Sequence, residues 1–85
     1  MSKNKPKVTA RWVYVVSEYH LMLLVNGVPH AEVWHNKPRV WRVGAVVGLY
    51  SVTGRAITIE NAKRRCEKWL TKQFAKMGIE LEVVK

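Results

Sequence analysis

The chain has 85 residues and a formal net charge of +9, from 15 Lys and Arg against 6 Asp and Glu. This length suits one domain, and the single cysteine excludes an intramolecular disulfide. The opening MSKNKPK shows no secretory signal, and the apolar run at residues 21–25 is too short to cross a bilayer. We therefore expect a cytoplasmic protein with no membrane partner.

The first half of the chain predicts strands. Residues 1–7 are polar and basic, and we interpret them as a flexible arm ahead of a single domain at residues 8–85. Residues 8–16 are rich in β-branched and aromatic side chains, which indicates a strand.

The dipeptide Asn26-Gly27 stands between two apolar runs and is a strong signal of a β-hairpin. A short helix capped by Ser17 is the other interpretation of residues 17–25, and the sequence leaves that choice open. An uninterrupted hairpin register predicts the cross-strand pairs Val25 with Val28, Leu23 with His30, Leu21 with Glu32, and Tyr19 with Trp34.

Residues 39–50 alternate between two faces and indicate another strand. We expect Trp41 on the face that packs against the core, and Arg42 and Tyr50 on the other face. Residues 53–55 resemble a tight loop, and residues 79–84 predict a last strand with Glu80 and Glu82 pointing outward.

Between residues 53–55 and the last strand we expect a helix that begins after Thr58, a good N-cap, and ends near Gly78. Together these elements predict an α+β fold: an antiparallel sheet of four to five strands with one long C-terminal helix packed on one face. The expected apolar stripe of the helix is Ile59, Ala62, Cys66, Trp69, Leu70, Gln73, Phe74 and Met77, opposite Lys63, Arg64, Lys68, Lys72 and Lys76.

The sequence offers no pattern typical of catalysis or metal binding. The soft ligands His20, His30, His35 and Cys66 match no zinc spacing. Cys66 falls in the apolar stripe, where a cysteine behaves as a small hydrophobe. No acid–base pair, nucleophile motif or phosphate loop can be assembled. We therefore expect a non-enzymatic protein without a cofactor or metal.

Charge gives the main functional signal, because residues 37–76 hold ten basic residues and two acidic ones. Such a surface attracts polyanions, and exposed aromatic rings can stack on bases. We predict binding to nucleic acid, with DNA favoured over RNA. The candidate contact residues are Arg39, Arg42, Tyr50, Arg55, Lys63, Arg64, Lys68, Lys72 and Lys76.

Residues 39–68 combine a strand that contains Trp, a glycine-bearing turn and a helix that opens T-x-E-x-A, through Trp41, Ala45, Gly48, Gly54, Thr58, Glu60, Ala62 and Cys66. With this pattern they resemble the DNA-binding domains of plant ethylene-response factors, the arm-binding domains of phage integrases, and small phage-encoded proteins. The resemblance implies that the sheet enters the major groove, with Arg39, Trp41 and Arg42 nearest DNA. The Pro-Trp-Gly turn of those domains is absent here, and an extra strand and hairpin precede the motif.

A second hypothesis is a protein-binding module, such as a phage-type inhibitor or adaptor that acts on a host protein in the host cytoplasm. The apolar first half motivates it, because one helix cannot cover both hairpin faces. Pairing of sheet edges would also permit a homodimer. The candidate partner-binding residues are Tyr19, Leu21, Leu23 and Trp34.

Overall fold

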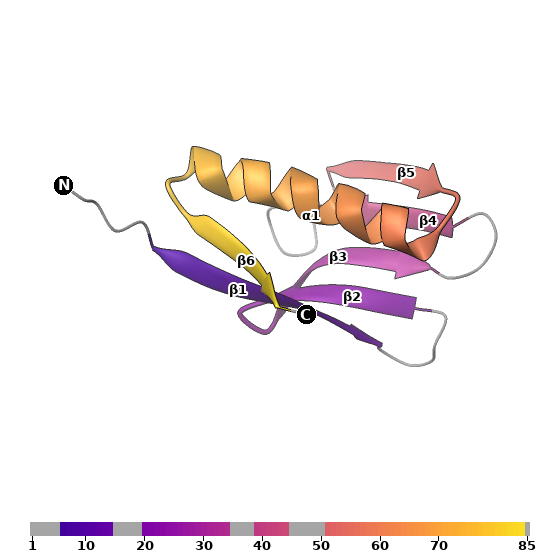
Figure 1. Ribbon diagram of the computed structural model, residues 1–85, viewed down its shortest axis with the longest axis horizontal. Helices are drawn as coiled ribbons and strands as arrows, with labels where there is room; N and C mark the ends of the chain where they lie inside the picture. The colour runs from indigo at the N-terminus through magenta and orange to yellow at the C-terminus, as the bar shows by residue number, and fades with distance from the viewer. Residues whose placement is uncertain (1–5, 15–19, 35–38, 45–50, 85) are drawn as a thin grey trace.

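The computed structural model describes residues 6–14, 20–34, 39–44 and 51–84, which form a sheet with one helix across it (Figure 1). The α+β class is confirmed. Most of the predicted arm lies outside these ranges, although its last residue, Lys7, already belongs to the first strand. The elements are β1 (Lys7–Tyr14), β2 (His20–Val25), β3 (Val28–Trp34), β4 (Arg39–Val43), β5 (Val52–Ala56), α1 (Ile59–Lys76) and β6 (Glu80–Val84).

The described strands form one six-stranded sheet in the order β5-β4-β3-β2-β1-β6. Neighbours are antiparallel except β1 and β6, which pair in parallel, so the prediction of an antiparallel sheet of four to five strands is wrong. The reason is the chain path: α1 carries the chain from β5 at one edge to β6 at the other edge (Figure 1). The alternation within β6 does not record which way the strand runs.

The hairpin turn is confirmed, but its register differs from the prediction. Asn26 and Gly27 both have positive φ, +52° and +82°, as a tight two-residue hairpin turn requires. The pairing then shifts between Leu23 and Leu24, which leaves His30 as an extra residue on β3. This irregularity is a β-bulge, because two residues of one strand oppose one residue of the other.

The bulge exchanges the two faces of β3, because side chains alternate with a period of two. Leu21 and Leu23 share one face with buried β3 residues, whereas Trp34 lies on the opposite face. The observed pairs are Val25 with Val28, Leu24 with Pro29, Leu23 with Ala31, Met22 with Glu32, Leu21 with Val33, and His20 with Trp34.

Residues 53–55 are part of β5, so the prediction of a loop there is wrong. Thr53 Oγ1 donates a hydrogen bond to the Trp41 carbonyl oxygen across 2.9 Å. Gly54 pairs with Trp41, and a Cβ on Gly54 would lie 2.7 Å from Cζ2 of that ring. The glycine that suggested a loop is therefore the strand position against which the indole packs.

The helix boundaries follow their predicted caps. Thr58 Oγ1 accepts a hydrogen bond from the Asn61 backbone N–H across 3.1 Å, and Gly78 has φ +77° just after the C-cap. The described ranges contain no helix long and apolar enough to cross a membrane. Met77 is 55% exposed and does not belong to the stripe; the buried helix residues are Ala62, Cys66, Leu70 and Phe74.

The core lies between α1 and one face of the sheet. Trp41 is only 7% exposed, which confirms its predicted place in the core. Burial of each large apolar side chain stabilises the fold by roughly 1.5–3 kcal/mol. The buried residues that the sheet contributes are Ala10, Leu21, Leu23, Val25, Ala31, Val33, Trp41, Val43 and Leu81.

We predict that Gly54→Ala lowers the free energy of unfolding by about 1–3 kcal/mol, because the added methyl group overlaps the Trp41 ring. Urea denaturation of the two proteins measures the difference. The same substitution in a Trp41→Phe background provides the control, since the smaller ring leaves more room. An equal loss of stability in both backgrounds would contradict this explanation.

Candidate nucleic-acid interface

The outward side of α1 is a basic surface. Since the apolar stripe faces the sheet, the opposite positions of the helix meet solvent. From Asn61 to Lys76 the exposed positions carry five cations and no carboxylate, and the cations, from Arg64 to Lys76, span about 18 Å at the helical rise. We call these five residues the outer basic face: Arg64, Arg65, Lys68, Lys72 and Lys76.

Among the described residues, no carboxylate forms an ion pair with a cation of the outer basic face. The ion pairs in this part of the chain join Lys7 to Glu82, and both His20 and Arg42 to Glu32. None of the five helix cations has a hydrogen bond or ion pair with a described residue. Their positive charges are therefore available to an external anion.

Lys63 differs from the other predicted helix cations, because it lies at the flank of the helix and is partly buried. Its ammonium nitrogen is 5.7 Å from the centre of the Trp12 ring, within cation–π distance. The indole Nε1–H of Trp12 in turn donates a hydrogen bond to Glu67 Oε2 across 2.6 Å. Lys63 is therefore part of a cluster between α1 and β1.

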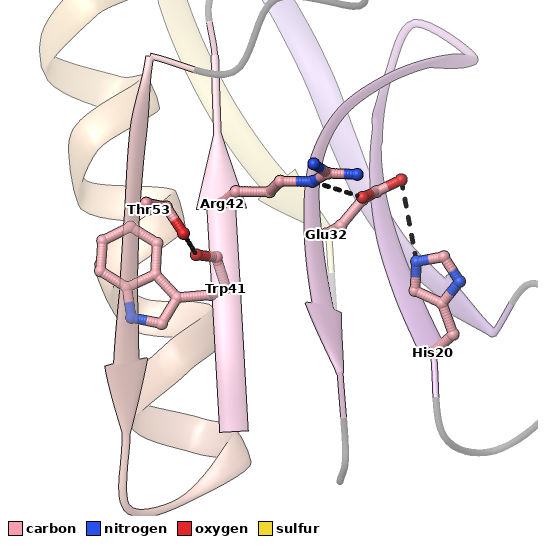
Figure 2. A network of polar contacts seen from close by, with 5 residues as sticks. All are labelled: His20, Glu32, Trp41, Arg42 and Thr53. Carbon is pink, nitrogen blue, oxygen red and sulfur yellow. Dashed lines mark hydrogen bonds and ion pairs between the residues drawn. The ribbon is translucent and has the colours of Figure 1, made fainter. Parts of the chain in front are cut away.

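Arg42 lies on the sheet face that α1 does not cover, in a polar network around Glu32 (Figure 2). Arg42 Nε donates to Glu32 Oε1 across 2.9 Å, and its guanidinium lies 5.1 Å from the Trp34 ring centre. Glu32 is 7% exposed, although it is on the open face. The first role of Arg42 is thus to neutralise a buried carboxylate.

His20 completes this network from β2. Its ring stacks on Trp34 with centroids 4.9 Å apart, and its Nε2 lies 3.8 Å from Glu32 Oε2 (Figure 2). That distance permits an ion pair when the imidazole is protonated. The centre of the open sheet face is therefore occupied by side chains that bind one another.

Arg42 and Arg55 do not join the outer basic face. Arg55 is exposed on β5 and pairs with Val40, on the same sheet face as Arg42. Arg39 is in β4 and pairs with Ala56, while Tyr50 lies outside the described residues. The structure therefore brings together Arg64, Lys68, Lys72 and Lys76, and it separates Arg42 and Arg55 from them.

Of the predicted partner-binding residues, the three that the structure describes do not lie on one surface. Leu21 and Leu23 are 4% and 0% exposed beneath α1, so their prediction as contact residues is wrong. Trp34 points to the other sheet face, and Tyr19 lies outside the described residues. The physical reason is the bulge at His30, which places the two leucines on the helix side. The protein-binding hypothesis stays a prediction, without a common surface formed by Leu21, Leu23 and Trp34.

Sequence reasoning missed two participants. Arg65 is exposed and extends the outer basic face. It is three residues before Lys68, so the helical period alone places the two cations side by side. Glu32 is the second participant. The predicted register pairs it with Leu21, whereas in the structure it pairs with Met22 and Arg42 and accepts a hydrogen bond from Arg42 Nε.

Cys66 is buried in the core, and burial raises the pKa of its thiol to about 12, with a smaller contribution from the nearby negative charge of Glu67. Its side chain packs with the apolar residues of the stripe. No group of three or more His, Cys, Asp or Glu that could hold a metal ion occurs within the described ranges.

The chain matches no family model, no curated protein and no solved structure.

We predict that Cys66 reacts very slowly with a thiol reagent at pH 8. With a pKa of about 12, only about one molecule in ten thousand carries the reactive thiolate at that pH. The rate of colour release from Ellman's reagent measures this reactivity, and the urea-unfolded protein should react at once. A Thr71→Cys variant, with its thiol on the exposed side of the same helix, is the matched control. Equal rates at positions 66 and 71 would contradict the buried assignment.

Proposed function

We propose that this chain is a small non-enzymatic protein that binds duplex DNA through the outer basic face of α1. The observation that carries the proposal is the run of five exposed cations with no carboxylate among the exposed positions from Asn61 to Lys76. Duplex DNA is the natural counterpart, because it carries one negative charge per roughly 1.7 Å of helix axis.

The shape of the surface also suits a duplex. An exposed α-helix fits the major groove of B-form DNA, whereas the deep, narrow major groove of an RNA duplex does not admit it. The outer basic face is opposite the helix stripe that packs on the sheet. This geometry favours DNA over RNA.

The side chains of the outer basic face favour contacts to phosphates over contacts to bases. The exposed positions between the cations hold Thr71 and Ala75, and neither offers the bidentate amide that reads adenine. Arginine can read guanine, but lysine supplies three of the five cations. We therefore infer binding with little preference for base sequence.

Arg42 and Arg55 lie apart from the proposed DNA-binding surface. Arg42 neutralises Glu32, and Arg55 is on the sheet face opposite to α1. A duplex seated on the outer basic face would not reach that side of the sheet.

We predict a steep salt dependence of duplex binding. If all five cations release counterions, the logarithm of the binding constant falls with the logarithm of salt at a slope of about −4.5. Raising the salt from 50 to 200 mM should then weaken binding roughly 500-fold. Fluorescence anisotropy of a labelled duplex measures the slope, and a slope near zero would remove the proposal.

The surface itself is tested by two single charge reversals of equal size. Lys68→Glu, at the centre of the outer basic face, should weaken duplex binding by at least about tenfold in 100 mM salt and reduce the slope by about 1. Arg55→Glu changes the net charge by the same amount on the opposite side and should have a much smaller effect. Equal losses in both variants would mean that total charge, and not the helix face, governs binding.

A further inference from the structure

A pocket of about 520 Å³ lies at the flank of α1, between the first turns of the helix and the adjacent ends of β1 and β6. Its volume falls within the range of about 300–1,000 Å³ that small-molecule sites occupy. Neither the core nor the outer basic face accounts for this space.

The pocket lies beside the last residues at which β6 pairs with β1. Parallel pairing of β1 with β6 ends at Arg11 and Val84, whereas β1 continues three residues further, to Tyr14. Trp12 therefore lies just past the last residue of β6 that pairs with β1. One wall of the pocket is apolar, formed by Trp12, Val83 and Val84.

The orientation of the Trp12 indole is fixed by α1. Its Nε1–H donates to Glu67 Oε2 across 2.6 Å, and Lys63 Nζ lies 5.7 Å from its ring centre. Among the described residues, Glu67 Oε1 has no hydrogen-bond or ion-pair partner, so it remains an acceptor on the pocket wall. A held aromatic ring therefore lies beside both a cation and a carboxylate oxygen.

The cationic part of the lining comes from both sides of the opening. Arg11 contributes from β1, and Lys63 and Arg64 contribute from α1. Neither Arg11 nor Arg64 has an ion-pair partner in the described part of the chain. Arg64 also belongs to the outer basic face, so the pocket adjoins that face at its N-terminal end.

We propose that this pocket binds one unpaired nucleotide unit, a base with its attached phosphate. The base packs against the Trp12 wall, since aromatic side chains stack on every base type. Arg11 and Arg64 pair with the phosphate, and Glu67 Oε1 accepts from an N–H group on the base edge, such as the ring N3–H of thymine or the amino group of adenine. Glu60 on the pocket rim disfavours ligands that carry many negative charges.

Two sources share this chemistry: a free nucleoside monophosphate, and an unpaired nucleotide at the end of a DNA strand. The second source rests on the proposed function, because it requires the strand to be held by the neighbouring outer basic face. The first source does not depend on duplex binding.

The test is a titration of the ¹⁵N-labelled full chain with dTMP, with AMP, and with duplexes that carry or lack a single-stranded overhang, followed through the four tryptophan indole N–H signals. A Trp12→Phe variant assigns the Trp12 signal. We expect dTMP, AMP or the overhang to move the Trp12 signal, while the Trp34 signal on the opposite sheet face stays in place. Inorganic phosphate, which lacks a base, should not reproduce the shift.

Arg11→Ser and Trp12→Leu should each weaken this binding by at least about fivefold, since they remove the phosphate contact and the stacking wall. Arg11 is exposed, so its variant keeps the test valid if Trp12→Leu fails to fold. Arg55→Ser, which removes one exposed cation on the opposite sheet face, is the matched control and should leave mononucleotide binding unchanged.

The outcomes separate this inference from the proposed function. An unmoved Trp12 signal with millimolar mononucleotides and with overhangs overturns the pocket inference, even where blunt duplexes bind. An equal shift with inorganic phosphate, or undiminished nucleotide affinity in Arg11→Ser, also overturns it. Mononucleotide binding without any duplex binding supports the pocket and removes the proposed function.

Discussion

The packing of one helix stripe against one face of the sheet is the contact on which the rest of this structure depends. Small and medium side chains at Ala62 and Cys66 let the helix approach the strands closely, and Leu70 and Phe74 fill the space toward its end. A chain of this length has little other apolar surface to bury. Once these positions face inward, the exposed side of α1 is determined by the helical period alone.

The same packing divides the charge of the molecule. The cations of the outer basic face are exposed, with no carboxylate among the exposed positions from Asn61 to Lys76, whereas Arg42 on the opposite sheet face is held by Glu32. A buried carboxylate without a partner would be strongly unfavourable, so Arg42 stabilises the fold first. The positive charge on the helix is therefore exposed on one surface, whereas that of Arg42 is part of a polar network on the opposite face of the sheet.

The edge of the sheet contributes the third feature. The ring of Trp12 lines a pocket beneath the first turns of α1, beside the last residues at which β6 pairs with β1. The bond from its indole to Glu67 joins helix and strand at that point. A basic surface and an aromatic-lined pocket thus adjoin each other along one helix.

The sequence by itself determined the local features: the caps at Thr58 and Gly78, the hairpin turn at Asn26-Gly27, the helix stripe and most of the basic face. Each of these features depends on contacts between residues close in the chain, so a helical period or a turn dipeptide is enough to predict it. The direction of β6, the bulge at His30 and the packing of Gly54 under an indole were decided by tertiary structure. Those features join residues distant in the chain, and a one-residue shift of register exchanges buried and exposed side chains without altering any local pattern.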